Sequence, residues 1–337
     1  MLTDLPLEEL EQYRPRVPEP DDFDAFWAEQ LAAAREHDLG LRSEHVEAGL
    51  ATVEVHDLRF RGHGGAPIAA WLLLPAGVDR PLPTVVEFAS YGGGRGLPHE
   101  RLVWSAAGYA HLIMDTRGQG SSSTEGCTAD PGELGQPAAP GYLTRGILDP
   151  RTAYLTRLYV DTARAVEAAR GLHAIDPTRI AVAGVSQGGG LALAAAHLAG
   201  DDVAAVVAAV PFLAHIRRAV DLTDEQPYAE IASYGAAHPD HVDRMFATLG
   251  YHDVVNHARR VRAPALVATG LADTICPPST VYAAANHLAG PGQVLAYPFD
   301  GHDGGGAHRV REELRFVAAR LGPASTTSRG PTSSPFS

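Results

Sequence analysis

The sequence predicts an α/β fold in which a mostly parallel central sheet is buried between helices on both of its faces. Short apolar runs rich in Val, Ile, Leu and Ala recur along the chain, and segments of helical periodicity lie between them. The runs are continuously apolar and do not alternate, which is typical of parallel strands covered on both sides. A length of 337 residues allows one large domain built on such a sheet.

An extension of different character precedes this pattern. Residues 21–37 are expected to form a helix, because large apolar side chains recur there at helical spacing. Two β-rich runs follow at 52–60 and 68–74, and the glycine-rich segment 62–65 between them is typical of a hairpin turn. The fold should therefore begin with a helix and a β-hairpin.

The alternation of strands and helices occupies the rest of the domain. The expected strands lie at 84–88, 111–114, 180–183, 203–210, 265–268 and 294–297. The expected helices lie at 100–107, 153–169, 188–198, 279–288 and 308–320. This order indicates successive parallel strands joined by helical crossovers.

Two long segments interrupt that order. Residues 120–149 are rich in Gly, Pro and Ser, and residues 212–257 are longer than a simple crossover and contain helical patches of their own. Long connections in compact domains are usually functional or disordered, so both are expected to be insertions around a site. We predict a single domain over residues 1–322 and a disordered low-complexity tail at 323–337.

The composition excludes several classes of function. A net charge of −13 argues against nucleic acid and against anionic membranes as partners. Every basic residue is Arg, so a Schiff-base lysine is excluded. The two cysteines, Cys127 and Cys276, are too few for a disulfide framework and are expected to be free thiols. Neither a signal peptide nor an apolar stretch long enough for a bilayer is recognisable, so we expect a cytoplasmic protein.

A nucleophile motif lies at residues 184–188, which read GVSQG and match G-x-S-x-G. An apolar strand precedes the motif and an Ala- and Leu-rich helix follows it, which is the strand–turn–helix of a nucleophile elbow. The glycines on both sides let strand and helix approach closely. The sequence therefore predicts an α/β-hydrolase fold with Ser186 as its nucleophile, at the start of a helix where backbone N–H groups are free.

A serine nucleophile needs a base, and the base needs an acid to orient it. In this fold the chain order is Ser, then Asp or Glu, then His. Asp273 and His302 fit that order, and each follows an expected strand at the carboxyl edge of the sheet. The predicted triad is Ser186, Asp273 and His302, with Asp300 and Asp303 as alternatives for the acid.

The oxyanion hole requires two N–H donors. Gln187, the residue after the nucleophile, should supply one, and the loop at 89–96, which reads ASYGGGRG, should supply the other. A glycine run is also found in phosphate cradles, but no Gly-Lys-Ser/Thr follows and the G-x-G-x-x-G spacing is absent. We therefore expect no nucleotide, no other cofactor and no metal.

Further segments carry a resemblance to a known family. They are RGQG (117–120), the elbow, His302 followed by an acid, GYLTRGILDP (141–150), VPFLAHIRRAV (210–220), QPYAEI (226–231) and ADTICPPSTV (272–281). On these motifs the chain resembles carbohydrate esterase family 7, the acetyl xylan esterases and cephalosporin C deacetylases, from about residue 21 to residue 321.

The resemblance implies the same triad and assigns further roles. The backbone N–H groups of Tyr91 and Gln187 would form the oxyanion hole. Tyr91 and Pro227 would line the substrate pocket, and Arg117 and Gln119 would be structural residues near the site. The family is usually a homohexamer whose active sites face an inner cavity.

The expected function is removal of acetyl groups from small acetylated substrates, such as xylo-oligosaccharides or cephalosporin C-like esters. The alternatives are a broad-specificity short-chain carboxylesterase and, less favoured, a peptidase on the same scaffold; a non-catalytic binding protein would have lost a triad member. Two positions depart from the family pattern: Ser90 replaces a Gly before the oxyanion-hole tyrosine, and Asp303 replaces a Glu after the histidine.

Overall fold

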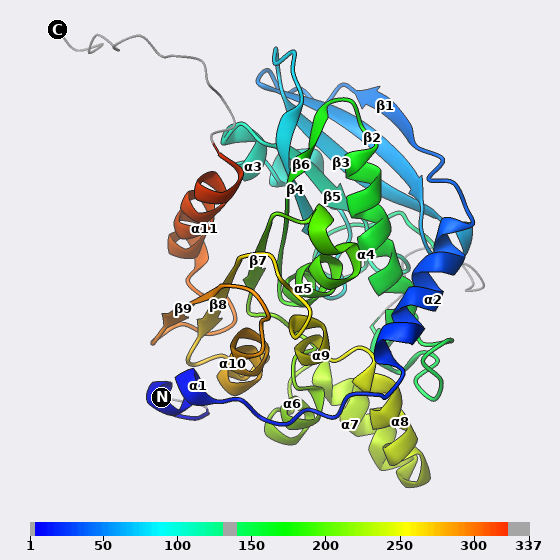
Figure 1. Ribbon diagram of the computed structural model, residues 1–337, viewed down its shortest axis with the longest axis vertical. Helices are drawn as coiled ribbons and strands as arrows, with labels where there is room; N and C mark the ends of the chain where they lie inside the picture. Colours follow the sequence, from blue (N-terminus) through cyan, green and yellow to red (C-terminus); the bar gives the residue numbers. More distant parts are fainter. Residues whose placement is uncertain (1–3, 131–139, 323–337) are drawn as a thin grey trace, which may run out of the picture.

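A computed structural model describes residues 4–130 and 140–322. Its centre is one nine-stranded sheet of order β1-β2-β3-β5-β4-β6-β7-β8-β9 (Figure 1). The strands are β1 (Arg42–Val46), β2 (Val53–Arg61), β3 (Pro67–Pro75), β4 (Leu82–Phe88), β5 (Ala110–Met114), β6 (Ile175–Val185), β7 (Ala205–Ala209), β8 (Ala265–Gly270) and β9 (Gly292–Tyr297).

The strand directions confirm a mostly parallel sheet with an N-terminal hairpin. Strands β1, β2, β3 and β5 are antiparallel neighbours in that order. The remaining neighbours, which run from β5 through β4, β6, β7 and β8 to β9, are all parallel. The predicted hairpin is β2 and β3, which pair from Val53 with Pro75 to Arg61 with Pro67. Since parallel strands end at the same edge, the loops after β4, β6, β8 and β9 lie together.

Helices cover both faces of the sheet, as the sequence predicts. The helices are α1 (Leu7–Gln12), α2 (Phe23–Arg35), α3 (Val103–Ala106), α4 (Tyr154–Arg170), α5 (Gln187–Ala199), α6 (Ile216–Leu222), α7 (Tyr228–Ala237), α8 (Val242–Gly250), α9 (Val254–Ala258), α10 (Pro278–Asn286) and α11 (Gly306–Leu321). Helices α4 and α5 pack on one face, and α3 and α11 pack on the other (Figure 1).

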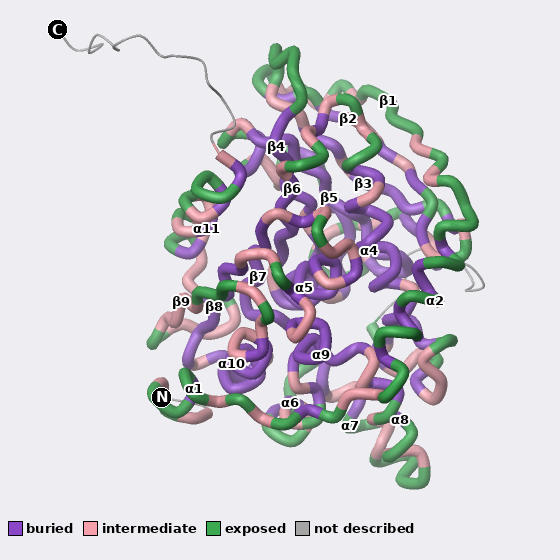
Figure 2. The backbone as a smooth tube through the Cα atoms, viewed as in Figure 1, coloured by how far each residue is buried: buried purple, intermediate pink, exposed green. Residues whose placement is uncertain are grey.

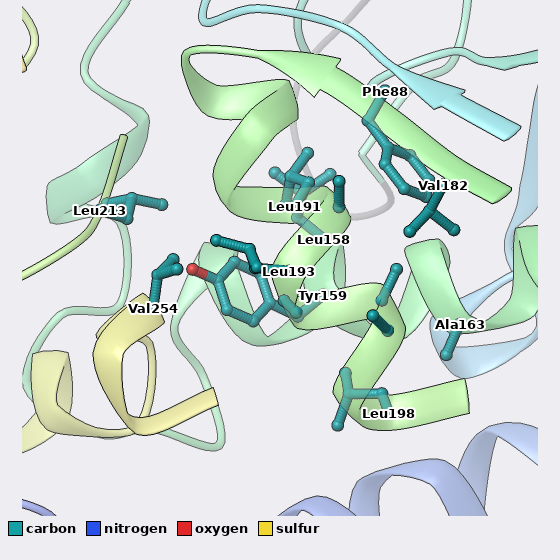
Figure 3. Close-up of a cluster of buried hydrophobic side chains, with 14 of the residues drawn as sticks. Phe88, Leu158, Tyr159, Ala163, Val182, Leu191, Leu193, Leu198, Leu213 and Val254 are labelled. Atoms are coloured by element: carbon teal, nitrogen blue, oxygen red, sulfur yellow. The ribbon is translucent and has the colours of Figure 1, made fainter. Parts of the chain in front are cut away.

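The core has two layers because neighbouring residues of a strand point to opposite faces. On β6, Ile180 and Val182 belong to the large cluster beneath α4 and α5, whereas Ala181 and Ala183 belong to the smaller cluster beneath α11. Figure 3 shows part of the large cluster, with Phe88 and Val182 from the sheet, Leu158 from α4 and Leu191, Leu193 and Leu198 from α5. In Figure 2 the central strands and α5 are buried almost throughout, while β1 at the edge is mostly exposed.

Two elements of the extension are absent from the sequence prediction. Strand β1 reads RSEHV and is exposed along most of its length, so it has no apolar pattern and depends on its pairing with β2. Helix α1 is six residues long and buries only Leu10, against Leu271 and Tyr282. Both elements are held by tertiary contacts, which the local sequence does not encode.

The two predicted insertions differ in structure. Residues 212–257 contain α6 to α8 and all but the last residue of α9, while the described residues of 120–149 contain only a short 3-10 turn at Tyr142–Thr144. The predicted tail at 323–337 lies outside the described residues. Over the described ranges, no helix is both long enough and apolar enough to cross a bilayer.

Buried histidines fix helix α2 against the body of the fold. His257 contacts the rings of Phe23, Trp27 and Tyr159 at centroid distances of 5.1, 5.2 and 5.1 Å. His252 contacts the Trp27 ring and makes a 2.7 Å hydrogen bond with the Thr156 hydroxyl. Burial lowers the pKa of His252 to about 3 and lowers the pKa of His257 well below its usual value.

Acid should therefore destabilise the protein through these histidines. The folded-state pKa values of both histidines lie below the unfolded value of about 6.5. Their contribution to the unfolding free energy is therefore complete above that pH and is lost as the pH falls below it. Each histidine should cost about 1.4 kcal/mol of unfolding free energy per pH unit below about 6.5. Acid acts on stability in the opposite direction through Asp253, because burial raises the pKa of its carboxyl to about 6.

To isolate the effect of His252, the unfolding free energies of the wild type and of His252→Gln are measured in urea between about pH 6.5 and 5. Carboxylates of the unfolded chain stay ionised in this range. The variant should show a pH slope smaller by about 1.4 kcal/mol per unit. Equal slopes would mean that His252 is not held neutral by burial.

Candidate active site

Ser186 lies on a sharp turn between β6 and α5. Its backbone has φ 58° and ψ −118°, a left-handed φ that is costly for a residue with a side chain. Two glycines permit this turn. A Cβ added to Gly184 would lie 2.3 Å from the backbone of Gly188, and a Cβ added to Gly188 would lie 2.1 Å from the carbonyl oxygen of Phe88 on β4.

The three predicted triad residues converge at the carboxyl edge of the sheet. The Nε2 atom of His302 lies 3.0 Å from the Ser186 hydroxyl oxygen, and its Nδ1 atom lies 2.9 Å from Oδ2 of Asp273. The loops that follow β6, β8 and β9 supply these side chains, although 116 positions separate Ser186 from His302 in the chain. The arrangement has the hydrogen-bonding order of a nucleophile, a base and an orienting acid.

The carboxylate of Asp273 is fully buried and is held in place by the backbone. Its Oδ1 atom accepts N–H hydrogen bonds from Ile275 at 2.8 Å and Cys276 at 2.9 Å, which leaves Oδ2 for His302. The two alternative acids lie elsewhere. Asp300 accepts from the N–H groups of Gly301 and Gly305 and thereby shapes the histidine loop, and Asp303 is an exposed residue at the cavity wall.

The two predicted oxyanion donors lie beside the nucleophile. Gln187 is the first residue of α5, where the opening turn leaves backbone N–H groups without helical partners. Tyr91 lies in the loop after β4 and lines the same cavity as Ser186. Within residues 4–130 and 140–322, neither N–H donates to a protein acceptor, so both donors are available to a developing oxyanion.

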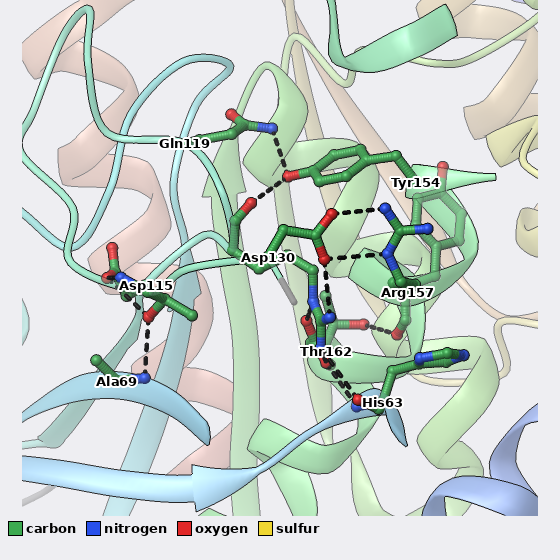
Figure 4. A network of polar contacts seen from close by, with 12 residues as sticks. His63, Ala69, Asp115, Gln119, Asp130, Tyr154, Arg157 and Thr162 are labelled. Carbon is green, nitrogen blue, oxygen red and sulfur yellow. Dashed lines mark hydrogen bonds and ion pairs between the residues drawn. The ribbon is translucent and has the colours of Figure 1, made fainter. Parts of the chain in front are cut away.

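Gln119 connects the loop that carries Tyr91 with the start of α5. Its side-chain oxygen accepts from the N–H of Gly92 at 2.6 Å, and its amide nitrogen donates to the Gln187 side chain at 3.0 Å. The same nitrogen donates to the Tyr154 hydroxyl, which in turn donates to the carbonyl oxygen of Arg117 at 2.6 Å (Figure 4). Gln119 thus fixes the loop after β4 relative to the start of α5.

Arg117 is a buried cation between two buried carboxylates. It binds Asp161 through Nη2 at 2.7 Å and Asp130 through Nη1 at 3.1 Å, and all three side chains are at most 1% exposed. The two carboxylates raise the pKa of the Arg117 guanidinium against the effect of burial. Asp161 also accepts from the N–H of His63, and Asp130 is bound by Arg157 (Figure 4). Arg117 therefore joins α4, the hairpin turn and the first insertion.

The departure at Ser90 has a structural consequence. The Ser90 hydroxyl donates a 3.0 Å hydrogen bond to the carbonyl oxygen of Val185, the residue directly before the nucleophile. A glycine at this position has no such group. The loop that carries Tyr91 is consequently fixed to the end of β6 by a contact that sequence reasoning did not identify.

A cavity of about 540 Å³ opens over the nucleophile. Its wall includes the predicted Tyr91, Ser186, Pro227 and His302. The remaining wall residues, which sequence reasoning did not assign to the pocket, are Ser90, Ser122, Ser123, Pro140, Val185, Gln226, Ile275, Asp303, Gly306 and Arg309. Both insertions contribute to this wall, which is mostly apolar and carries a few hydroxyl and amide groups.

Cys276 was predicted only as a free thiol, and it is one, but it lies beside the triad. Burial raises the pKa of its thiol, which is near the Ser186 hydroxyl. In the part of the chain that the structure describes, Asp273, Cys276 and His302 form the single group able to hold a metal ion, with ligand atoms within 4.8 Å. Asp273 and His302 already bind each other there, and the expected absence of a metal stays a prediction.

Comparisons with known proteins agree on one family. Residues 1–320 match the family model described as acetyl xylan esterase (AXE1). The solved acetyl xylan esterase of a Paenibacillus species is 39% identical, with a TM-score of 0.87 and coverage of 94% of this chain and 100% of that one. A second acetyl xylan esterase, from a Thermoanaerobacterium species, is 32% identical with a TM-score of 0.85 and covers 94% and 99%.

A curated acetyl esterase of Xylanibacter ruminicola is 29% identical over 310 residues, which cover 87% of this chain. The chain spans 65% of the length of that relative. An acylaminoacyl peptidase of Pyrococcus horikoshii is similar at 16% identity and a TM-score of 0.56, covering 81% of this chain and 41% of that one. This last likeness shows a shared α/β-hydrolase fold alone.

Gly188→Ala should disrupt the elbow. The new methyl group would overlap the Phe88 carbonyl oxygen in a buried strand, so we expect a loss of at least about 2 kcal/mol in unfolding free energy and a collapse of turnover. Gly235→Ala is the matched control, since its Cβ would meet nothing closer than 3.6 Å inside helix α7, and it should be neutral or gain up to about 1 kcal/mol. Denaturant unfolding measures both, and equal effects would refute the argument from close approach.

Proposed function

This chain belongs to the acetyl xylan esterase family of carboxylic ester hydrolases, and from that premise we propose that it releases acetate from acetylated small molecules through a serine acyl-enzyme. The observation that carries the proposal is the continuous hydrogen-bonded order of Ser186, His302 and Asp273, of which Ser186 and His302 line the cavity. Such a chain activates a hydroxyl nucleophile without a metal or cofactor.

In the acylation step, His302 Nε2 accepts the proton of the Ser186 hydroxyl while the oxygen attacks the acetyl carbonyl carbon. Asp273 holds the other ring nitrogen and stabilises the positive charge that forms on the imidazole. The N–H groups of Gln187 and Tyr91 bind the negative oxygen of the tetrahedral intermediate. His302 then returns the proton to the departing alcohol, and the acetyl group remains on Ser186.

In the deacylation step, water takes the place of the alcohol. His302 removes a proton from that water, the resulting oxygen attacks the acetyl-enzyme carbonyl, and the same two N–H donors bind the second oxyanion. The proton passes back to Ser186 as acetic acid leaves, and the acid ionises to acetate in solvent. No external acid or base is needed, since His302 exchanges one proton in each half-reaction.

The cavity wall favours a small acyl group and a polar alcohol. Pro227 and Tyr91 are the residues we assign to the acyl side, next to the nucleophile. Ser122, Ser123 and Gln226 offer hydroxyl and amide groups to the alcohol portion of the ester. This chemistry supports acetylated xylo-oligosaccharides or cephalosporin C-like acetates as substrates, and a broad short-chain carboxylesterase remains the alternative.

The assembly and the compartment are further proposals. The family resemblance supports a homohexamer, and the chain composition supports a cytoplasmic location without nucleic-acid or membrane partners. Light scattering after size-exclusion chromatography measures the assembly directly, and a monomer at micromolar concentration would contradict the hexamer.

Ser186→Ala should lower kcat by about a millionfold, because the nucleophile and its partners act as a unit. A fluorophosphonate should label the wild type once per chain and leave the variant unlabelled. Ser43→Ala, a change at an exposed strand position, is the control and should keep both turnover and labelling. Acetate release by Ser186→Ala at the wild-type rate would refute the assignment.

A substrate panel should rank acetyl esters first. On one alcohol, kcat/KM should fall by at least about tenfold from acetyl to butyryl, since an extra apolar segment changes binding in a fitted pocket by about 1–3 kcal/mol. Acetylated sugars and acetylated cephalosporins are compared by acetate release, and anilides test for amide hydrolysis. Equal rates for acetyl and butyryl esters would favour the broad carboxylesterase, and faster anilide cleavage would favour a peptidase.

A further inference from the structure

Glu230 lies in the first turn of α7, within the QPYAEI motif, and has no place in the chemistry described so far. Its carboxylate accepts three hydrogen bonds from two other segments of the chain. The donors are the Tyr91 hydroxyl, the N–H of Gly141 at 2.9 Å and the N–H of Leu143 at 3.2 Å. One carboxylate thus joins the loop after β4, the first insertion and the second insertion.

The Tyr91 side chain is held firmly at this point. Its hydroxyl donates to Glu230 and accepts from the N–H of Tyr142 at 3.2 Å. Its ring packs edge-on against Tyr142 and Phe212 at centroid distances of 5.2 and 6.1 Å. Burial and the Glu230 carboxylate both raise the pKa of the Tyr91 hydroxyl, so it stays protonated and remains a donor.

The contacts on either side of Tyr91 explain why its side chain matters for its backbone. Ser90 is bound to the carbonyl oxygen of Val185, and the N–H of Gly92 is bound to Gln119. The Tyr91 side chain, held by Glu230, is the third fixed point of this short loop. Three points fix the orientation of the peptide group that carries the Tyr91 N–H, and catalytic donors need placement to within about 0.5 Å.

Glu230 does not belong to the cavity wall, whereas Tyr91 does. The carboxylate of Glu230 therefore does not contact the reacting atoms. We propose that Glu230 is a positioning residue of the oxyanion hole, whose carboxylate holds Tyr91 so that the Tyr91 N–H faces the oxygen that becomes negative on attack by Ser186. This inference rests on the proposed esterase mechanism and extends it to a residue outside the cavity.

The test uses two variants that remove little volume. Glu230→Gln keeps the shape but turns one acceptor into an amide donor, which opposes a backbone N–H. Tyr91→Phe removes only the hydroxyl. Each variant should lower kcat by about tenfold and change KM by less than about threefold. Complete loss of an oxyanion donor lowers kcat by about 100- to 1000-fold, so a misplaced donor should lose a part of that effect. Glu225→Gln, the same charge change at an exposed position of the same segment, is the control and should keep wild-type kinetics.

Two readouts separate positioning from a general loss of structure. The affinity for a trifluoromethyl ketone, which forms a tetrahedral adduct with the serine, should fall by the same factor as kcat/KM. The double variant should lose no more than the larger single loss, because both changes act through the same contact between Tyr91 and Glu230. Thermal unfolding of each variant is measured alongside.

The outcomes distinguish this inference from the function on which it rests. Wild-type acetate release and fluorophosphonate labelling are measured first, and failure there would remove the esterase proposal itself. If the wild type is active and Glu230→Gln keeps its kcat, or if the losses in the double variant multiply, the positioning role of Glu230 is wrong. A fall in kcat and in ketone affinity together, at unchanged KM, supports it.

Discussion

The close approach of β6, α5 and β4 is the constraint on which the rest of the structure depends. Gly184 and Gly188 lie so near other backbone atoms that neither can carry a side chain. This contact lets the chain reverse within one residue and leaves Ser186 in a left-handed conformation at the start of a helix. Ser186 and the N–H of Gln187 are placed by the same turn, so the proposed chemistry is coupled directly to strand–helix packing.

A layer of buried polar groups supports that turn. Arg117 and its two carboxylates are nearly free of solvent, and burying such charges costs several kcal/mol per ion unless each is bound. The contacts of Arg117 with Asp130 and Asp161, and of Gln119 with Gly92, satisfy these groups while joining separate loops. The layer therefore defines one arrangement of the loops around the nucleophile, which simple apolar packing specifies less well.

The two insertions complete the cavity and add polar groups to its mostly apolar wall. The first supplies Ser122 and Ser123 to the cavity, and the second supplies Gln226 and Pro227. Glu230, in the second insertion, binds the first insertion and the loop of Tyr91, so the cavity wall and the proposed oxyanion hole form one hydrogen-bonded unit.

The sequence by itself determined the α/β-hydrolase fold, the elbow and the identity of the residues that meet at the sheet edge. These features depend on local patterns: apolar runs, helical spacing and a glycine-flanked serine at a strand end. The chain order of Asp273 and His302 then followed from the topology of a parallel sheet, in which every strand delivers its loop to the same edge.

Only the tertiary structure decided which side chains hold that edge together. Glu230 and Tyr91 lie 139 positions apart, and their contact depends on how the second insertion is placed against the loop after β4. The bond of Ser90 to Val185, the position of Cys276 beside Ser186 and the exposed strand β1 likewise lack a local pattern. Periodicity reports which face of an element is buried, whereas partners across loops are selected by the three-dimensional course of the chain.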